Sequence, residues 1–403
     1  MTHSYQLFRI AKAACIALCL GIATQASASS DIQVRHLASE QNIVTITRAQ
    51  KYLLLPVQDD APEAQVRIVK DNMPVGVAFN VRLARQRIDY YVPLELSAYQ
   101  DDNISISIMG LPEHAQCWKG LKQSDTFDLG NREKFRPLYH HTPLYGWMND
   151  PNGMFYKDGV YHLYFQHNPY GSLWGNMSWG HSTSTDLVNW EFQGIPIRPD
   201  AWGTIFSGSA VIDHENTAGF GKGAVVAIYT SDNRGSQSQS IAYSLDNGQT
   251  FTKYAGNPVL TSTKRDFRDP KVFWYAPGKH WVMILAVGQE MQIFSSANLK
   301  EWKHESSFGA KQGAHGGVWE CPDLVELPIE NTKEKRWVLI CNVNPGGPFG
   351  GTAAPTWFIL STSMKAPTSS ALWGRTNEQK TKQDIKCSLQ NNGCASAMPF
   401  KQA

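Results

Sequence analysis

Apolar and polar residues alternate at a period of two over short segments in the first third of the chain. The alternation is clearest in ranges 42–47, 65–69 and 103–108, while ranges 75–83 and 88–96 are rich in β-branched and aromatic residues. A period of two places the apolar side chains on one face of a β-strand. Because helical spacing is scarce here, the pattern predicts a small antiparallel β-sandwich over residues 31–130.

A different pattern follows a polar, basic stretch at residues 131–134, which predicts a linker. The expected strands become aromatic, as in ranges 161–165 and 280–285. A loosely conserved phrase recurs at 184–190, 244–251 and 295–302, at intervals of about 50 to 60 residues. Each copy is a Ser-containing strand, an Asp or Asn turn, and an aromatic residue that opens the next strand. This interval matches one four-stranded propeller blade, so we predict an all-β propeller over residues 137–361; a string of unrelated hairpins is the alternative.

Three carboxylates stand in similar sequence settings. Asp150 lies in the segment WMNDPNG, Asp269 in RDP and Glu320 in WECP, so each has a proline within two residues and an aromatic residue or arginine nearby. The proline and glycine after Asp150 predict a rigid turn that fixes its carboxylate. The three acids are expected in three successive repeats. Since the innermost strand of every blade lines the propeller axis, acids more than a hundred residues apart can meet at one mouth.

Composition adds little to this picture. The chain has 403 residues and a formal net charge of +2, which gives no indication of a nucleic acid or of an anionic membrane surface as a partner. Its 13 tryptophans suit either a sugar-binding surface or the core of a β-protein. The seven cysteines are scattered and show no metal-ligand spacing, so we expect no metal and no cofactor.

The two ends of the sequence have distinctive compositions. Residues 1–28 read as a signal peptide, with Arg9 and Lys12 before an apolar stretch at 13–23 and a small-residue cleavage pattern at 26–28. We therefore expect a secreted, periplasmic or cell-surface protein, with no segment able to span a membrane. Residues 362–403 are rich in Ser, Thr, Lys, Gln and Asn, which predicts a disordered tail and an incomplete last blade.

Six segments occur in the order WMNDPNG, YFQHNP, WGNMSWGH, FSGS, FRDP and WECPDL. Together they resemble glycoside hydrolase family 32, which includes levanases, inulinases and invertases. The resemblance covers residues 137–351. It implies a five-bladed β-propeller. It also implies a retaining hydrolase that cleaves the β-fructosidic bonds of fructans (levan or inulin) or of sucrose through a covalent fructosyl-Asp intermediate.

The resemblance also implies roles for individual residues. Asp150 matches the nucleophile, Glu320 the general acid/base, and Asp269 the residue that holds the fructose hydroxyls and stabilises the transition state. In chemical terms, one carboxylate must be ionised near the anomeric carbon, while another must hold a proton for the leaving oxygen. The family pattern places further residues around the bound fructose: Asn149, Asn152, Gln166, Trp174, Phe206 and Ser207. Arg268 can pair with a carboxylate or reach a sugar hydroxyl.

Two other functions are compatible with the same residues. A fructosyltransferase would use the same covalent intermediate with a sugar in place of water. A truncated, non-catalytic fructan-binding protein would keep the binding residues without turnover. The motifs leave open the preference between β-2,6 and β-2,1 linkages and between endo and exo action.

Overall fold

The computed structural model describes residues 31–128, 136–137, 139–345 and 354–360, the last range without its side chains. The expected signal peptide, the linker at 131–134 and the tail at 362–403 lie outside these residues. The chain separates into two compact units, Met1–Phe127 and Asp128–Ala403. The domain boundaries drawn from the sequence stay predictions.

The first unit consists of two antiparallel sheets, with strand orders β1-β2-β7-β4-β5 and β6-β3-β8. The alternation seen in the sequence sets the register: Val44 of β2 lies opposite Ile106 of β7, and both side chains are fully buried. Leu53 and Val92 of the second sheet are buried as well, which confirms the predicted sandwich. The elements are β1 Ile32–Ala38, β2 Gln41–Ile46, β3 Tyr52–Val57, β4 Ala64–Lys70, β5 Met73–Val81, β6 Tyr90–Glu95, η1 Ser97–Tyr99, β7 Ile104–Met109, α2 Cys117–Gly120 and β8 Lys122–Ser124.

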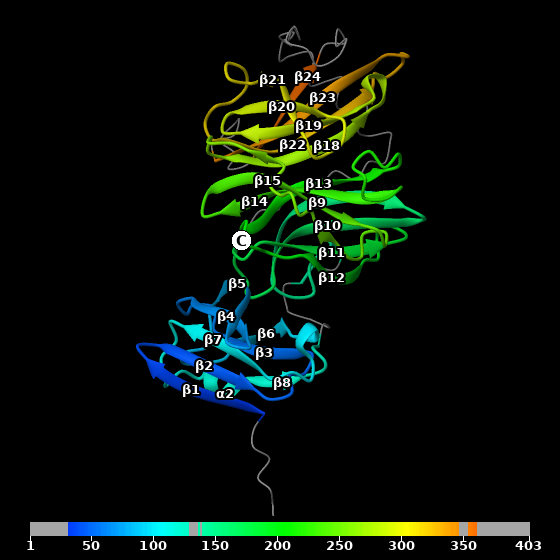
Figure 1. The fold of residues 1–403 in the computed structure, drawn as a ribbon. Helices are drawn as coiled ribbons and strands as arrows, with labels where there is room; N and C mark the ends of the chain where they lie inside the picture. The colour runs from blue at the N-terminus through cyan, green and yellow to red at the C-terminus, as the bar shows by residue number, and fades with distance from the viewer. Residues whose placement is uncertain (1–30, 129–135, 138, 346–353, 361–403) are drawn as a thin grey trace, which may run out of the picture. The chain divides into compact units, whose positions relative to one another are not determined.

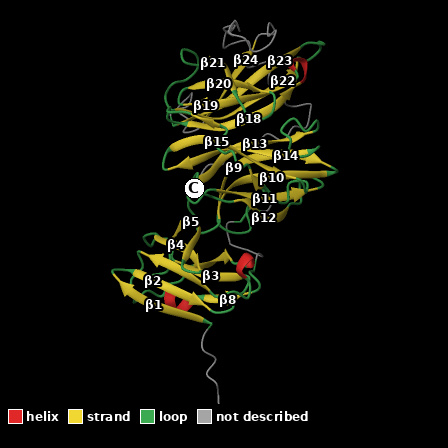
Figure 2. Cartoon of the chain, viewed as in Figure 1, coloured by secondary structure: helices red, strands yellow, loops and turns green. Residues whose placement is uncertain are grey.

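The second unit is built from four antiparallel sheets in the part of the chain that the structure describes (Figures 1 and 2). The first sheet contains β9 Trp147–Lys157, β10 Val160–Asn168, β11 Ser178–Ser184 and β12 Glu191–Ile197. The second contains β13 Thr204–Asp213, β14 Ala224–Asn233, β15 Ser236–Ser244, β16 Thr252–Lys253 and β17 Leu260–Thr261. The third contains β18 Phe267–Tyr275, β19 His280–Val287, β20 Glu290–Ser296 and β21 Lys303–Phe308, with the short helix η2 Ala276–Gly278 between β18 and β19. The fourth contains β22 Val318–Pro328, β23 Lys335–Asn344 and β24 Ala354–Leu360.

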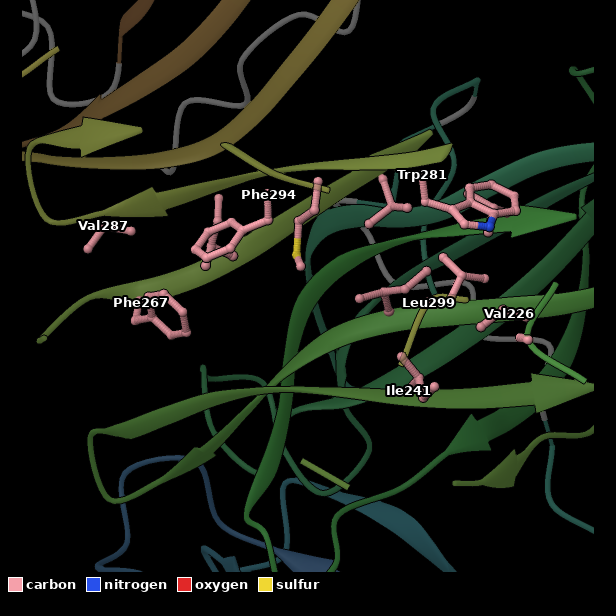
Figure 3. Close-up of a cluster of buried hydrophobic side chains, with 13 residues drawn as sticks. Val226, Ile241, Phe267, Trp281, Val287, Phe294 and Leu299 are labelled. Atoms are coloured by element: carbon pink, nitrogen blue, oxygen red, sulfur yellow. The ribbon is translucent and has the colours of Figure 1, made fainter. Parts of the chain in front are cut away.

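Neighbouring sheets pack face to face through apolar side chains. One buried cluster joins Val226 and Ile241 of the second sheet to Phe267, Trp281 and other residues of the third (Figure 3). Comparable clusters join the first sheet to the second and the third to the fourth. The first strands of the sheets are also neighbours, since β9 contacts β13, β13 contacts β18 and β18 contacts β22. This is the blade-by-blade arrangement that the repeats predict.

The three recurring phrases form equivalent turns between the third and fourth strands of successive sheets. In the first copy the Ser184 hydroxyl bonds to the Asp186 carboxylate at 3.0 Å, and the Asp186 carboxylate accepts the N–H of Val188 at 2.8 Å. The second and third copies repeat the serine contact, at Ser244 with Asp246 and at Ser296 with Asn298. A side chain that satisfies backbone donors in this way fixes a tight turn. The repeats therefore mark turns with the same geometry in three sheets.

The segment around Asp150 is not the turn that its proline and glycine suggest. It lies inside the 11-residue strand β9, and Asp269 and Glu320 likewise lie near the beginnings of β18 and β22. The reason is that β9 and β22 end the strand order of their sheets, so each pairs on one side only. An edge strand tolerates a proline, because its missing N–H need not be one that the ladder uses.

Each of these first strands has an irregular register at the candidate residues. Pairing shifts opposite Asn149 and Asp150 in β9, between Ile205 and Gly208 in β13, between Arg268 and Lys271 in β18, and between Glu320 and Asp323 in β22. A β-bulge interrupts the ladder and turns a side chain away from the regular alternation. The four irregularities therefore mark the four places where the first strands can direct side chains to a common point.

Gly208 allows the irregularity in β13. A Cβ atom added there would lie 2.0 Å from the carbonyl oxygen of Ile228, a backbone atom of the neighbouring strand. Gly208→Ala is therefore expected to lower the free energy of unfolding by about 2 kcal/mol or more, because the backbones must move apart.

Chemical unfolding of Gly208→Ala beside Gly171→Ala tests this expectation. A Cβ at Gly171 would meet only the Asn168 side-chain nitrogen, at 4.0 Å. The Gly171 variant should therefore unfold like the parent. Equal stability of both variants would contradict the close approach at Gly208.

Candidate active site

The four first strands bring the sequence-predicted residues to one end of the second unit. β9 carries Asp150, β13 carries Phe206 and Ser207, β18 carries Arg268 and Asp269, and β22 carries Glu320, in each case near the beginning of the strand. The expectation that the acids lie in three successive repeats is wrong. The second sheet lies between the sheet that carries Asp150 and the sheet that carries Asp269. The intervening sheet contributes a serine instead of an acid, so a search for carboxylates passes over it.

Asp150 is the point where three of these strands meet. The Ser207 hydroxyl of β13 donates to Asp150 Oδ2 at 2.6 Å, and the Cys321 thiol of β22 lies 3.4 Å from the same oxygen. Asp150 itself is only half-buried. Its carboxylate is therefore fixed by two neighbours and remains partly accessible.

Asp269 is the most enclosed of the three acids, with a side chain that is 7% exposed. Its Oδ2 atom accepts the backbone N–H of Cys321 at 2.9 Å, and its own N–H donates to the Thr230 hydroxyl at 3.1 Å. Burial raises the pKa of Asp269 to about 7, and the negative charge of Asp150 acts in the same direction. These two effects outweigh the Cys321 N–H and the Arg268 guanidinium, which lower the pKa.

Arg268 links the acids of β18 and β22. Its Nη2 atom lies 2.8 Å from Glu320 Oε1, its Nη1 atom lies 2.6 Å from Asp266 Oδ1, and its Nε atom lies 4.0 Å from Asp269 Oδ2. The planar guanidinium can hold several carboxylates in a fixed arrangement because its donors point along defined directions. In this structure Arg268 therefore pairs with carboxylates, the first of the two roles that its sequence context suggests.

Glu320 lies between a fully buried tryptophan, Trp319, and the half-buried Cys321. The Trp319 indole donates to the carbonyl of Ala314 at 2.7 Å, which anchors the beginning of β22. The Glu320 side chain is 25% exposed, so one face of the carboxyl remains open to solvent or ligand while Arg268 holds the other.

The amide side chains on β9 and β10 support the strands that carry the acids. Gln166 is buried and donates to the carbonyl of Ile205 at 3.0 Å. The buried Asn152 amide is satisfied when its oxygen accepts Gln166 Nε2 at 3.0 Å and its nitrogen donates to the Pro151 carbonyl at 3.2 Å. Asn149 accepts the Trp147 indole N–H at 2.8 Å. Contact of these three amides with a sugar stays a prediction.

Two aromatic residues flank the same end of the unit. Trp174 is 57% exposed, and its ring meets the edge of Phe206 with centroids 5.7 Å apart at an angle of 74°. The carbonyl of Phe206 accepts the indole N–H of the buried Trp179 at 3.0 Å, which fixes the strand beneath. Trp174 thus offers an exposed indole beside Phe206, which precedes Ser207 in β13.

Sequence reasoning missed three contributors. Cys321 was counted only among the scattered cysteines, whereas its N–H contacts Asp269 and its thiol contacts Asp150. Thr230 of β14 and Asp266, just before β18, orient Asp269 and Arg268. Cys321 could have been noticed because it follows Glu320 directly, but nothing in the sequence around Thr230 marks its role.

The described ranges contain neither a cluster suited to a metal ion nor a helix suited to a membrane. No group of three or more His, Cys, Asp or Glu side chains in those ranges is placed to hold a metal ion. Among the same residues, no helix has the length and apolar character needed to cross a membrane.

Residues 140–384, more than half of the chain, match the model of the glycosyl hydrolases family 32 N-terminal domain. The chain belongs to glycosyl hydrolase family 32. Residues 38–139 match a domain of unknown function, DUF4980.

Individual members of family 32 are closely similar over the second unit. A levanase of Bacillus subtilis is 57% identical over 225 residues, which cover 55% of this chain and 33% of the levanase. An extracellular exo-inulinase of Meyerozyma guilliermondii is 48% identical over 235 residues, covering 55% of this chain and 45% of the relative. The solved β-fructofuranosidase of Schwanniomyces occidentalis is 47% identical with a TM-score of 0.53, covering 56% of this chain and 46% of that one.

These likenesses establish the fold class while leaving part of each relative unmatched. Structural neighbours of family 32 have a five-bladed β-propeller, so the second unit has the propeller fold predicted from its sequence repeats. The chain spans about a third to a half of the length of the curated relatives it matches.

The raised pKa of Asp269 predicts how stability depends on pH. The ordinary pKa of the side chain is 3.8 and the folded value is about 7, so the folded protein holds a proton that the unfolded chain has lost between these values. The ionised carboxyl therefore costs stability as pH rises through this window. Asp269→Asn removes that charge. The free energy of unfolding of the variant minus that of the parent should therefore increase by on the order of 1 kcal/mol or more between about pH 5 and about pH 8.

Urea unfolding of Asp269→Asn and the parent across this pH range measures the difference. Asp158→Asn, at an exposed turn between β9 and β10, is the matched control for the substitution itself. A stability difference between Asp269→Asn and the parent that stays constant with pH would show that the Asp269 carboxyl does not carry the proton.

Proposed function

We propose that this member of family 32 is a secreted retaining hydrolase of β-fructosidic bonds, acting on fructans such as levan and inulin or on sucrose. The observation that carries the proposal is the convergence on Asp150. Ser207 and Cys321 hold its carboxylate from two other strands. The Cys321 N–H donates to Asp269, and Glu320 directly precedes Cys321 in the chain. The levanase, exo-inulinase and β-fructofuranosidase relatives support the substrate class.

The first step of the proposed reaction forms a covalent intermediate. A carboxylate oxygen of Asp150 attacks the anomeric C2 carbon of the fructosyl unit. The bond from C2 to the leaving oxygen breaks, and Glu320 donates a proton to that oxygen. Charge that develops on the sugar ring is stabilised by the neighbouring carboxylates, which are fixed before the substrate arrives.

The second step reverses these roles. Glu320 takes a proton from water, the water oxygen bonds to C2, and Asp150 leaves as a carboxylate. Two displacements on the same carbon retain its configuration. Asp269, which keeps its proton up to a pH of about 7, can both donate and accept hydrogen bonds with fructose hydroxyls in this cycle.

Two observations support export of the protein from the cell. Residues 1–28 have the charge, length and cleavage pattern of a signal peptide, and the exo-inulinase relative is described as extracellular. Polymeric fructans are encountered outside the cell membrane, so an exported hydrolase meets its substrate there.

The nucleophile assignment predicts the effect of Asp150→Asn. An amide cannot form the covalent intermediate, so hydrolysis of levan, inulin and sucrose should fall by at least about a thousandfold while the fold is kept. Reducing-sugar release and circular dichroism on the purified chain measure both properties. Asp158→Asn should retain full activity, and an equally active Asp150→Asn would end the assignment.

The acid/base assignment predicts a dependence on the leaving group. Glu320→Gln cannot donate a proton, so hydrolysis of fructosides with a sugar leaving group should fall by about a hundredfold or more. A fructoside with an acidic phenol as leaving group needs less protonation and should lose much less. Kinetics on both substrates, beside Glu326→Gln at the exposed end of the same strand, test the role. Equal losses on the two substrates would contradict it.

A further inference from the structure

An exposed tryptophan outside the motifs lies on the connection that enters the second sheet. Trp202 is 48% exposed and stands two residues before β13, in the segment between β12 and β13. Ser207, which contacts Asp150, lies five residues further along. An indole has a large apolar face and a polar N–H, so an exposed tryptophan on a fixed support can bind a ligand that is partly apolar and partly polar.

The turn that carries Trp202 is held rigidly by its own backbone. Asp200 and Gly203 exchange two backbone hydrogen bonds, at 3.2 and 3.0 Å, and the Trp202 N–H donates to Asp200 Oδ1 at 2.8 Å. Lys253 then fixes the other Asp200 oxygen at 2.6 Å and also donates to the carbonyl of Arg198. The indole is therefore presented on a fixed support while much of its surface stays in water.

The turn is also pressed against the neighbouring hairpin. A Cβ atom added at Gly203 would lie 2.0 Å from the Asp232 carbonyl oxygen and 2.8 Å from the Asn233 nitrogen, so the two backbones are in close contact. The next residue of that hairpin, Arg234, has a left-handed backbone and an exposed side chain. Trp202 and Arg234 thus come from turns that touch, and together supply an apolar face and a set of donors.

Strand geometry limits the distance from Trp202 to the site. From Thr204 to Ser207 the chain is in β13, which at the usual rise accounts for roughly 10 Å, and the full five residues from Trp202 span at most about 17 Å. The Trp202 backbone therefore lies within about 17 Å of Ser207. This distance is within reach of further units of an oligosaccharide bound at Asp150.

We propose that Trp202 is a stacking platform for a distal sugar unit of a fructan chain, with Arg234 of the neighbouring turn as a hydrogen-bond donor to the same chain. This inference rests on the proposed function and extends it: the platform favours oligomeric and polymeric fructans over sucrose. The apolar face of a sugar ring packs against the indole ring. Binding in this way is favoured when the aromatic surface is large and already fixed, because little conformational entropy is then lost.

The test compares the parent with Trp202→Ala, Trp202→Phe and Trp274→Ala. Trp274 is a half-exposed tryptophan near the far end of β18 and serves as the matched control. For fructo-oligosaccharides of increasing length, Trp202→Ala should lower kcat/KM about tenfold more than it does for sucrose, mainly through KM. Trp202→Phe should recover most of the loss, and Trp274→Ala should show no dependence on chain length.

A binding measurement keeps the inference separate from the proposed activity. Calorimetry with a fructo-oligosaccharide on Asp150→Asn, with and without Trp202→Ala, should show about tenfold weaker binding without the indole. A parent that cleaves no fructoside would overturn the proposed function, and the calorimetry would still decide the platform. Equal affinity of the two proteins, equal loss of kcat/KM on sucrose and long chains, or a change in oligomeric state on removing Trp202 would overturn the platform.

Discussion

Cys321 is the residue on which the relative positions of the acids depend. Its backbone N–H holds Asp269, its thiol contacts Asp150, and it directly follows Glu320 in the chain. A single residue of β22 thus fixes groups from β9 and β18, which lie in two other sheets. A small shift of one sheet against another would move the acids through this residue, because hydrogen bonds of this length tolerate little displacement.

Gathering carboxylates at one point opposes folding, and the surroundings show how the structure limits that cost. Burial and the charge of Asp150 make the ionised form of Asp269 unfavourable, whereas Arg268 and the Cys321 N–H favour it. One guanidinium lies within 4.0 Å of carboxylate oxygens from three acids, Asp266, Asp269 and Glu320. At a pH below about 7 a proton on Asp269 relieves part of the repulsion. Carboxylates that are fixed close together before the substrate arrives can also stabilise a positive charge that develops beside them.

Much of this arrangement could be predicted from sequence, because strand alternation and repeats are local properties. The alternation around Val44 and Ile106 predicted the sandwich, and the Ser-Asp phrases at Ser184 and Ser244 marked turns that the structure shows to be equivalent. The register irregularities could not be predicted, since they depend on which residues of a partner strand lie opposite. For the same reason, the sequence did not reveal that Ser207, from the second sheet, completes the surroundings of Asp150.

The prolines beside the acids lie at register irregularities within strands, not at turns. A proline after an acid suggested a turn, yet Asp269 and Cys321, which precede prolines, lie in strands with left-handed φ values of 63° and 48°. Non-glycine residues pay about 1–3 kcal/mol for such a conformation, so it persists only where the surroundings enforce it. Here the enforcing contact is the hydrogen bond from Cys321 N–H to the Asp269 carboxylate, which joins the two strained residues directly. The strain and the site geometry therefore have one cause. Relaxing either bulge to a regular ladder would break that bond and separate Asp269 from Asp150.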